Sequence, residues 1–456
     1  MIRKLFIGLA LLCLPLIALA NNVTQYRLNN GLTLIVKEDH RAPVVFTSVW
    51  YKVGGSYEHN GITGISHVLE HMMFRGTQKY PAGTLEKLMA QNGGQQNAMT
   101  ANDQTMYYQQ LSVDKLPLSF KLEADRMNNL TLSKKDFEKE IQVVMEERRM
   151  RFDDNPNATT YERFMATAFV NNPYHHQAIG WMTDLKHMTV QNVRDWYHTW
   201  YVPNNAILVV VGDVQPKRVL ALAKQYFSPL KARPVPVLKP RTEIPQIDTK
   251  HVDVYAPAKL PLLLMGYQTP SLVTAKEKWE PYALDVLSAI LAGGDSSRLT
   301  ENLVRGQQIA ITAQASYNLY TLHSSLFLLA GVPTPGHSIK QLQEALSKQV
   351  SDIQMQLVSP QELERVKAQV IAQNVYEKDS LSNQAMDIGI PETIGLSWRV
   401  DARYVTEINK VTAKEVQEVA KRYLTSKRLT IAVLHPTPIH GKEPVVTQPL
   451  SAPGIH

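Results

Sequence analysis

The chain has 456 residues, enough for two or three domains, with 48 Lys and Arg against 41 Asp and Glu and a formal net charge of +7. The basic residues are scattered along the chain, so nucleic-acid binding is poorly supported. A single cysteine excludes a disulfide bond within the chain and a metal site built from several thiolates.

The first twenty residues have the pattern of a secretory signal peptide. Arg3 and Lys4 precede an apolar run from Leu5 to Ala20, which ends in the A-x-A cleavage pattern Ala18-Leu19-Ala20. The run is short for a membrane span, and no longer apolar run follows it. We predict cleavage near Ala20 and a periplasmic or secreted bacterial protein that has no membrane span after cleavage. An uncleaved anchor is the alternative. Because Cys13 is removed with the peptide, any metal in the mature chain must be bound by His and carboxylate ligands.

Two predicted strands precede the most informative motif of the chain. Leu32–Val36 and Val44–Trp50 are rich in β-branched and aromatic residues. The pentapeptide that follows is His67-Val68-Leu69-Glu70-His71. On a helix, His67 and His71 lie one turn apart on the same face with Glu70 beside them. Two imidazoles in this arrangement can bind Zn²⁺ while the carboxylate faces the water that the metal activates. This H-x-x-E-H order is the inverzincin signature.

A possible peptide-binding strand comes next. Asn97, Ala98, Met99 and Thr100 follow the turn-forming pair Gly93-Gly94, and they alternate in the manner of an edge strand. An extended peptide could add to such an edge through main-chain hydrogen bonds. An ordinary edge strand without a ligand is the alternative interpretation of the same pattern.

A catalytic zinc needs a third protein ligand, and the best candidates lie on a predicted helix at residues 137–147. Ser133 with Asp136 three residues later is typical of a capping-box start to that helix. Glu140 and Glu147 are seven residues apart and share one face. By pattern alone either could be the ligand, and acidic residues on an exposed helix often only face solvent.

The chain repeats itself on either side of a proline-rich linker at residues 233–246, which is stiff and extended. The halves are residues 22–232 and 247–435, and residues 436–456 are predicted to be disordered. Thr189–Val211 contains a helix followed by an apolar strand, and Thr412–Leu434 repeats this pattern. Asp285–Ala289 stands opposite the zinc pentapeptide, without its ligands. The predicted fold is α+β, with two tandem homologous domains that each contain a mixed, largely antiparallel sheet flanked by helices. We expect one metal site per chain, in the first domain.

From about residue 24 to 435 the chain resembles the pitrilysin family of zinc peptidases, in the short-chain branch with the mitochondrial processing peptidases and bacterial two-subunit homologues. The matching stretches are Gly64–Thr77, Asn97–Thr100 with Asp103, Thr105 and Tyr107, Glu140–Glu147, and Tyr201–Asn205. The resemblance implies a zinc endopeptidase that hydrolyses peptides or short unfolded polypeptides. It implies His67, His71 and Glu147 as ligands of one Zn²⁺ per chain, Glu70 as the catalytic base, Glu140 as an assisting residue, and residues 97–100 as the substrate-binding strand.

One departure from the family pattern concerns subunit composition. Family members that act alone or as homodimers carry Arg and Tyr seven residues apart in the second half, where they hold the substrate. Val304 and Ile311 occupy those places here, and neither Arg298 nor Arg305 has a Tyr seven residues later. The resemblance therefore implies a heterodimer in which a homologous zinc-less subunit supplies the Arg/Tyr pair.

Two alternatives remain at this point. A non-catalytic assembly subunit could retain the peptidase fold, although the complete set of ligands argues against it. His175-His176 could form a second metal site, but neighbouring residues on a strand point to opposite faces, which favours a packing or surface role.

Overall fold

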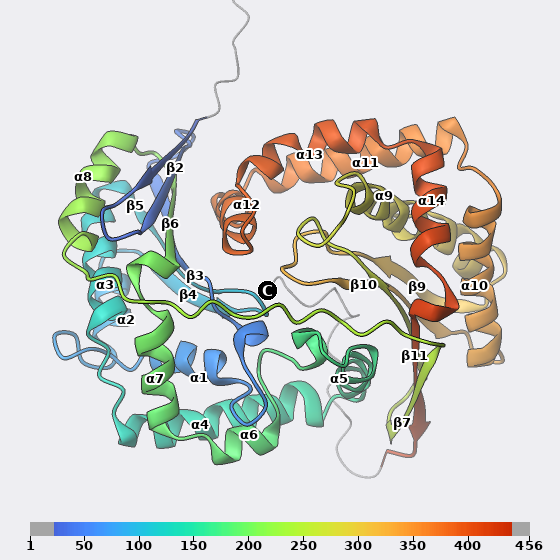
Figure 1. Cartoon of the computed structure of the whole chain (residues 1–456), viewed down its shortest axis with the longest axis horizontal. Helices are drawn as coiled ribbons and strands as arrows, with labels where there is room; N and C mark the ends of the chain where they lie inside the picture. The colour runs from blue at the N-terminus through green and yellow to red at the C-terminus, as the bar shows by residue number, and fades with distance from the viewer. Residues whose placement is uncertain (1–21, 440–456) are drawn as a thin grey trace, which may run out of the picture.

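Two mixed sheets, one in each half of the chain, form the frame of the protein (Figure 1). The computed structural model describes residues 22–439. The predicted signal peptide lies outside these residues. In the described part of the chain, no helix is both long enough and apolar enough to cross a bilayer.

The first sheet has the strand order β1-β2-β6-β3-β5-β4. Only the β2–β6 pair is parallel. Its strands are β1 (Val23–Arg27), β2 (Thr33–Glu38), β3 (Val44–Tyr51), β4 (Gln95–Thr100), β5 (Thr105–Ser112) and β6 (Ala206–Gly212). Strand β4 therefore lies at one edge of the sheet.

The second sheet repeats this arrangement, and among the residues that the structure describes it has no counterpart of β1. Its order is β7-β11-β8-β10-β9, and only the β7–β11 pair is parallel. Its strands are β7 (Lys250–Pro257), β8 (Leu262–Thr269), β9 (Ala310–Ser316), β10 (Ser325–Pro333) and β11 (Leu429–Thr437). The prediction of two homologous α+β domains with largely antiparallel sheets is confirmed.

Helices cover both sheets. The first half contains α1 (Ile65–Met72), α2 (Thr84–Gln91), α3 (Leu116–Asn128), α4 (Lys134–Arg148), α5 (Pro156–Ala168), α6 (Met182–His187), α7 (Val190–Trp200) and α8 (Pro216–Phe227). The second contains α9 (Glu280–Ala292), α10 (Ile339–Met355), α11 (Pro360–Glu377), α12 (Leu381–Thr393), α13 (Arg399–Lys410) and α14 (Ala413–Tyr423). The internal repeat extends to the helix caps: α7 begins at the capping box of Thr189, and α14 begins at that of Thr412.

The two halves exchange one helix each (Figure 1). Helix α5 of the first half packs on β11 and β7, where Phe164 is fully buried in a cluster with Leu264 and Leu328. Helix α12 of the second half packs on β6 and β3, where Ile388 joins a cluster that contains Trp50. One face of each sheet is therefore covered by a helix from the other half. The domains share their cores and are not independent bodies.

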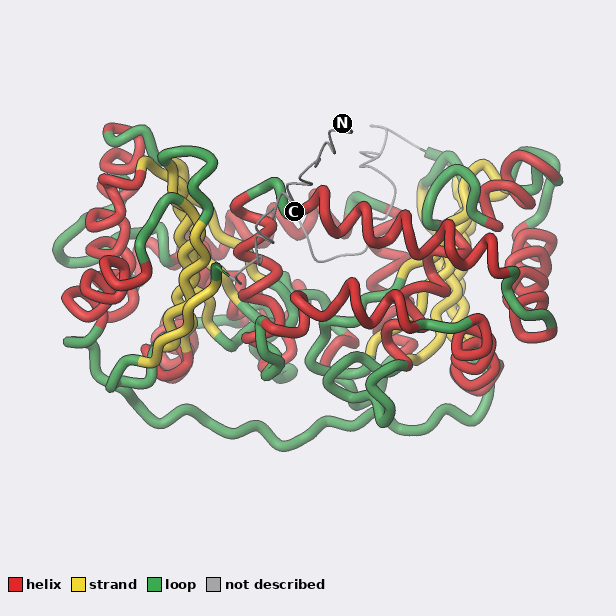
Figure 2. The backbone as a smooth tube through the Cα atoms, turned by 90° about the horizontal axis from the view of Figure 1, so that it is seen from above, coloured by secondary structure: helices red, strands yellow, loops and turns green. Residues whose placement is uncertain are grey.

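The segment between the halves is anchored to the first half by two charged side chains. Residues 228–249 contain no helix or strand and run along one side of the molecule (Figures 1 and 2). The Arg241 guanidinium donates to the backbone carbonyls of Ser56 and Glu58. The Glu243 carboxylate accepts hydrogen bonds from the backbone N–H groups of residues 170–172, at 2.8–3.0 Å. The extended linker thus contacts the loop before α1 and the loop after α5.

The predicted start of the disordered tail needs correction. Strand β11 runs to Thr437, and its last residues pair with the end of β7. Pro436 is tolerated there because β8, the other neighbour of β11, pairs with it only as far as Leu434. Residues 440–456 lie outside the described part of the chain.

Candidate metal centre

Helix α1 is held at its N-terminus by backbone geometry and a buried carboxylate. Gly64 precedes the helix with a φ of 88°, and a Cβ there would lie 3.0 Å from the carbonyl carbon of Ile179, so glycine is required. Its backbone N–H donates to Glu58 at 2.7 Å, and the N–H of Ser66 donates to the other oxygen of Glu58 at 2.9 Å. Glu58 therefore caps the helix that carries His67. Sequence reasoning did not identify this role.

Helix α4 carries the acidic candidates, and both of its ends are fixed. Ser133 is its N-cap and accepts from the backbone N–H of Asp136, as predicted. Near the C-terminus, the buried Arg148 forms an ion pair with Glu162 of α5 at 2.8 Å and donates to the carbonyl of Gly180 at 2.7 Å. The residue before this anchor is Glu147, so its backbone position is well defined.

His67, His71 and Glu147 meet at one point between α1 and α4. Each offers one ligand atom, and these atoms lie within 4.8 Å of one another. Glu147 Oε2 lies 3.6 Å from His67 Nε2 and 3.4 Å from His71 Nε2. Tetrahedral Zn²⁺ with ligands at about 2.0–2.1 Å holds them roughly 3.3 Å apart, so both distances from Glu147 are close to those that zinc requires. Among residues 22–439 no other group of three His, Cys, Asp or Glu side chains has such spacing.

Further charged side chains contact His71 and Glu147 on the sides that face away from the cluster. Glu140 Oε2 lies 3.4 Å from His71 Nδ1, and Glu140 Oε1 pairs with Arg75 at 2.7 Å. Arg151 pairs with Glu147 Oε1, the oxygen that faces away from the histidines, at 2.9 Å. Glu140 therefore lies where it can orient a ligand, and Glu147 is the acid that meets both imidazoles. Sequence reasoning gave no role to Arg75 or Arg151; their only signal is the spacing of four residues from His71 and from Glu147.

Electrostatics prepare His67 and Glu147 to bind a cation, whereas His71 must first lose a proton. Burial and the neighbouring His71 lower the pKa of His67 to about 4. Burial alone would raise the pKa of Glu147, but its hydrogen bond to His71 and the charges of His67 and Arg151 lower the pKa to about 2. Burial also acts to lower the pKa of His71, yet Glu147 outweighs it and the pKa is raised. At neutral pH the cluster therefore contains a neutral His67 and an ionised Glu147.

Glu70 lies between the metal cluster and strand β4. The Thr100 hydroxyl donates to Glu70 Oε2 at 2.5 Å. Burial raises the pKa of Glu70, against the opposing effect of this hydrogen bond. On the strand, Ala98 packs against the first core and Met99 packs against the cluster that includes α12, while Asn97 is exposed. The structure thus brings β4 and Glu70 together, and within residues 22–439 no strand pairs with the outer backbone edge of β4.

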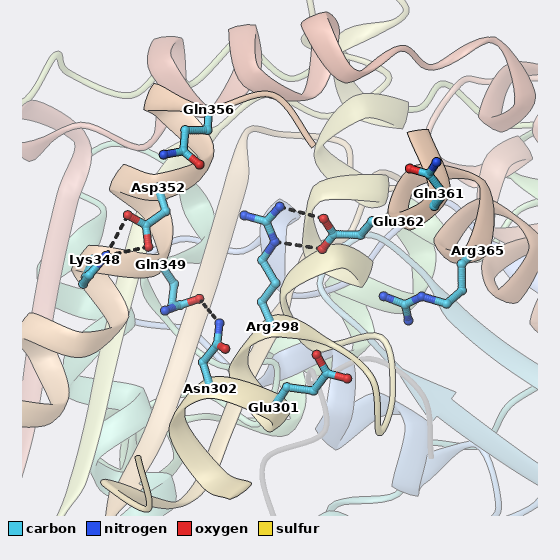
Figure 3. Close-up of a pocket in the computed structure, with 10 residues that line it drawn as sticks. All are labelled: Arg298, Glu301, Asn302, Lys348, Gln349, Asp352, Gln356, Gln361, Glu362 and Arg365. Carbon is cyan, nitrogen blue, oxygen red and sulfur yellow. Dashed lines mark hydrogen bonds and ion pairs between the residues drawn. The ribbon is translucent and has the colours of Figure 1, made fainter. Parts of the chain in front are cut away.

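The arginines considered for substrate binding in the second half are engaged elsewhere. Arg298 forms two hydrogen bonds with Glu362, at 2.8 and 2.7 Å. Both line a polar pocket of about 690 Å³ between α10, α11 and the helical segment that holds Arg298 and the π-helix Thr300–Gly306 (Figure 3). Arg305 lies 3.4 Å from Asp295. The pocket is built entirely from second-half residues and is separate from the metal cluster. At the family's Arg/Tyr places, Val304 packs against the second core and Ile311 is partly exposed on β9.

The prediction that His175-His176 lies on a strand is wrong. Pro173–His175 is a 3₁₀ turn, and the two rings meet edge to face with centroids 5.1 Å apart. Asn172 caps this turn through its side chain, which is why the chain turns there. His176 is buried, and burial lowers its pKa to about 4. The pair does not belong to a metal-like cluster among the described residues.

Comparison with known proteins adds independent findings. Residues 33–180 match the family model described as insulinase (peptidase family M16), and residues 187–370 match the one described as peptidase M16 inactive domain. The chain is 34% identical over 370 residues to a Helicobacter pylori protein called zinc protease PqqE, covering 78% of this chain and 80% of that protein. It is 23% identical over 416 residues to the uncharacterized zinc protease YmxG of Bacillus subtilis, covering 91% and 98%.

Solved structures of proteases share the fold of this chain. A protease from Helicobacter pylori superposes with a TM-score of 0.86 at 30% identity, covering 91% of this chain and 100% of that chain. The periplasmic protease PqqL of Escherichia coli shares the fold, with a TM-score of 0.77 at 18% identity, covering 92% of this chain but only 48% of the longer PqqL chain.

Proposed function

Because the chain belongs to peptidase family M16, we propose that it is a zinc-dependent endopeptidase that hydrolyses peptides or short unfolded polypeptides. The observation that supports this most is the meeting of His67, His71 and Glu147 from two separate helices, with Glu70 on the adjoining turn. Three protein ligands leave a fourth position open, which is the arrangement of catalytic rather than structural zinc sites.

In this proposal the chain's own residues have distinct tasks. His67, His71 and Glu147 would hold one zinc ion. When bound, zinc supplies Lewis-acid chemistry, since it polarises a carbonyl group and acidifies water. Glu70 acts as the general base that takes a proton from the attacking water and then delivers it to the nitrogen of the leaving amine. Glu140 orients His71 through its Nδ1 atom.

Strand β4 is the proposed substrate-binding strand. Asn97, Ala98, Met99 and Thr100 lie at the edge of the first sheet, next to α1. A peptide that pairs with this edge would be held through its main chain, so binding would depend little on its side chains. This suits a peptidase that accepts varied sequences.

A partner subunit and an exported location complete the proposal. The family's Arg/Tyr places carry Val304 and Ile311, which cannot donate hydrogen bonds from their side chains to a peptide. We therefore propose a heterodimer with a homologous zinc-less chain that supplies the pair. The PqqL chain, about twice as long, supports the idea that two such units work together, and its description as periplasmic agrees with the predicted signal peptide.

The test compares the wild type with Glu70→Gln and Glu147→Gln, each purified alone and with any homologous subunit that co-purifies. Cleavage is followed with a library of internally quenched peptides, and zinc is measured by atomic emission. Glu70→Gln should retain one zinc and lose cleavage, whereas Glu147→Gln should lose both. Zinc-free, inactive wild-type complex would favour the assembly-subunit alternative. Full activity of the lone chain would refute the heterodimer.

A further inference from the structure

We propose that the Thr100 hydroxyl is a positioning group that fixes the orientation of the Glu70 carboxylate and so ties the proposed base to the proposed substrate strand. The inference rests on the proposed peptidase function and assigns a task that is separate from peptide binding. It concerns one hydrogen bond between β4 and α1.

The contact is suited to positioning. The terminal torsion of a glutamate is broad, so an unsupported carboxylate turns freely between orientations. In this structure Thr100 Oγ1 donates to Oε2 of Glu70. A hydrogen bond to an ionised oxygen is about twice as strong as a neutral one. Threonine is branched at Cβ and has a stiff χ1 torsion, so its hydroxyl is held in place better than that of serine.

The backbone around Thr100 is fixed from both sides. Thr100 pairs in register with Thr105 of β5, whose hydroxyl donates to the carbonyl of Val53 at 2.9 Å. The residue after Thr100 also closes a turn, since Ala101 N–H donates to the carbonyl of Gln104 at 2.9 Å. The hydroxyl of Thr100 therefore starts from a defined position at the end of the strand.

The second half of the chain holds this turn as well. The buried Asp103 accepts from the hydroxyls of Ser56 at 2.8 Å and Tyr174 at 2.6 Å. It also accepts from the backbone N–H of Leu322 at 3.0 Å, in the loop that leads to β10. A turn anchored to both halves gives the end of β4 a rigid base, so the position of Thr100 depends on the assembled fold.

The same strand thus serves two purposes. A peptide paired with the free edge of β4 is located relative to the strand's backbone, and Glu70 is located relative to the Thr100 side chain of that strand. Loss of the hydroxyl should therefore disturb proton transfer more than peptide binding. The structure predicts a change in kcat with little change in KM.

The experiment uses Thr100→Val, which keeps the shape and removes the hydroxyl, in the full chain with its co-purifying subunit. We expect kcat to fall by about 10–100-fold. KM should stay within about twofold, the zinc content should remain that of the wild type, and the affinity of metal-free protein for a fluorescent peptide should be unchanged. Thr100→Ser should recover most of kcat because it restores the donor. The matched control is Thr47→Val on β3, which removes a similarly buried hydroxyl that bonds to Ser119 and touches neither Glu70 nor Thr100. It should change stability but not kcat by more than about twofold.

Each other result has a definite meaning. Wild-type kcat in Thr100→Val, or failure of the serine variant to recover it, would overturn the positioning role. A rise in KM at constant kcat would also overturn it, because Thr100 would then act on binding alone. Cleavage that survives in Glu70→Gln, or a wild type that does not cleave, would instead remove the proposed function and this inference with it.

Discussion

Replacing Gly389 by alanine tests the exchange of helices between the two halves. Gly389 lies within α12, where it faces Trp50 of the first sheet. An alanine Cβ would lie 2.5 Å from Cζ2 and 2.6 Å from Cδ2 of the indole, whereas carbon atoms pack best at about 3.5–4.0 Å. The ring is fully buried and its N–H donates to Ser48 at 2.9 Å, so it cannot move aside easily.

The magnitude follows from two opposing effects. In an exposed helix, glycine to alanine stabilises by about 1 kcal/mol. Here overpacking costs about 1–3 kcal/mol, and the rigid indole puts Gly389→Ala near the upper end. We expect the free energy of unfolding to fall by about 2 kcal/mol. Met99 of β4 belongs to the same apolar cluster, so a displaced α12 would also disturb the proposed substrate strand.

Urea unfolding followed by tryptophan fluorescence measures this change. The control is the same substitution in a Trp50→Leu background, which removes the indole and leaves room for the methyl group. There Gly389→Ala should be neutral or stabilising, and the double-mutant cycle should isolate the steric term. A stabilised Gly389→Ala single variant would refute the packing of α12 against the first sheet.

Three further predictions concern the other exchanged helix and the metal centre. Phe164→Ala should destabilise the protein by about 3–5 kcal/mol in urea unfolding, because the fully buried ring fills the second sheet's covered face. Arg163→Ala, at an exposed position of the same helix, should change the stability little, and equal effects of the two would contradict the burial. Glu140→Gln should weaken zinc binding by about 10–100-fold in a chelator competition. Unaltered zinc affinity would show that the contact between Glu140 and His71 does not contribute to zinc binding. Zinc affinity should fall on acidification by about tenfold per pH unit between about pH 4 and 6.5. In this range His71, whose pKa is raised, must lose one proton before it can bind zinc, whereas His67, whose pKa is about 4, is already neutral. A flat profile in that range would contradict this protonation pattern.

The parts of the site that depend on local geometry could be predicted from the sequence. The i, i+4 spacing of His67 and His71 needs only a helix, and the Ser133 cap marks where α4 begins. The choice of Glu147 over Glu140 could not come from the pattern, because both lie on one face of α4. It depends on how α1 packs against α4. The structure brings Glu147 to the Nε2 atoms of both imidazoles and Glu140 to the Nδ1 atom of His71.

The long-range features were beyond sequence reasoning. An apolar stripe on α5 or α12 indicates that the helix is buried, but it does not say which sheet buries it. The exchange of these helices therefore went unpredicted. The contacts of Arg241 and Glu243 were missed for a related reason: a proline-rich linker predicts an extended backbone and carries no signal for its anchor points.

In the proposed mechanism, one zinc ion held by His67, His71 and Glu147 would allow Glu70 to drive peptide hydrolysis. The most direct test is a zinc titration of metal-free protein, with its co-purifying subunit, in a peptide-cleavage assay. Cleavage should rise from zero and break at one zinc per chain, and Glu70→Gln should bind the same amount of zinc without cleaving. Cleavage by the metal-free protein, or undiminished cleavage by Glu70→Gln, would contradict the mechanism.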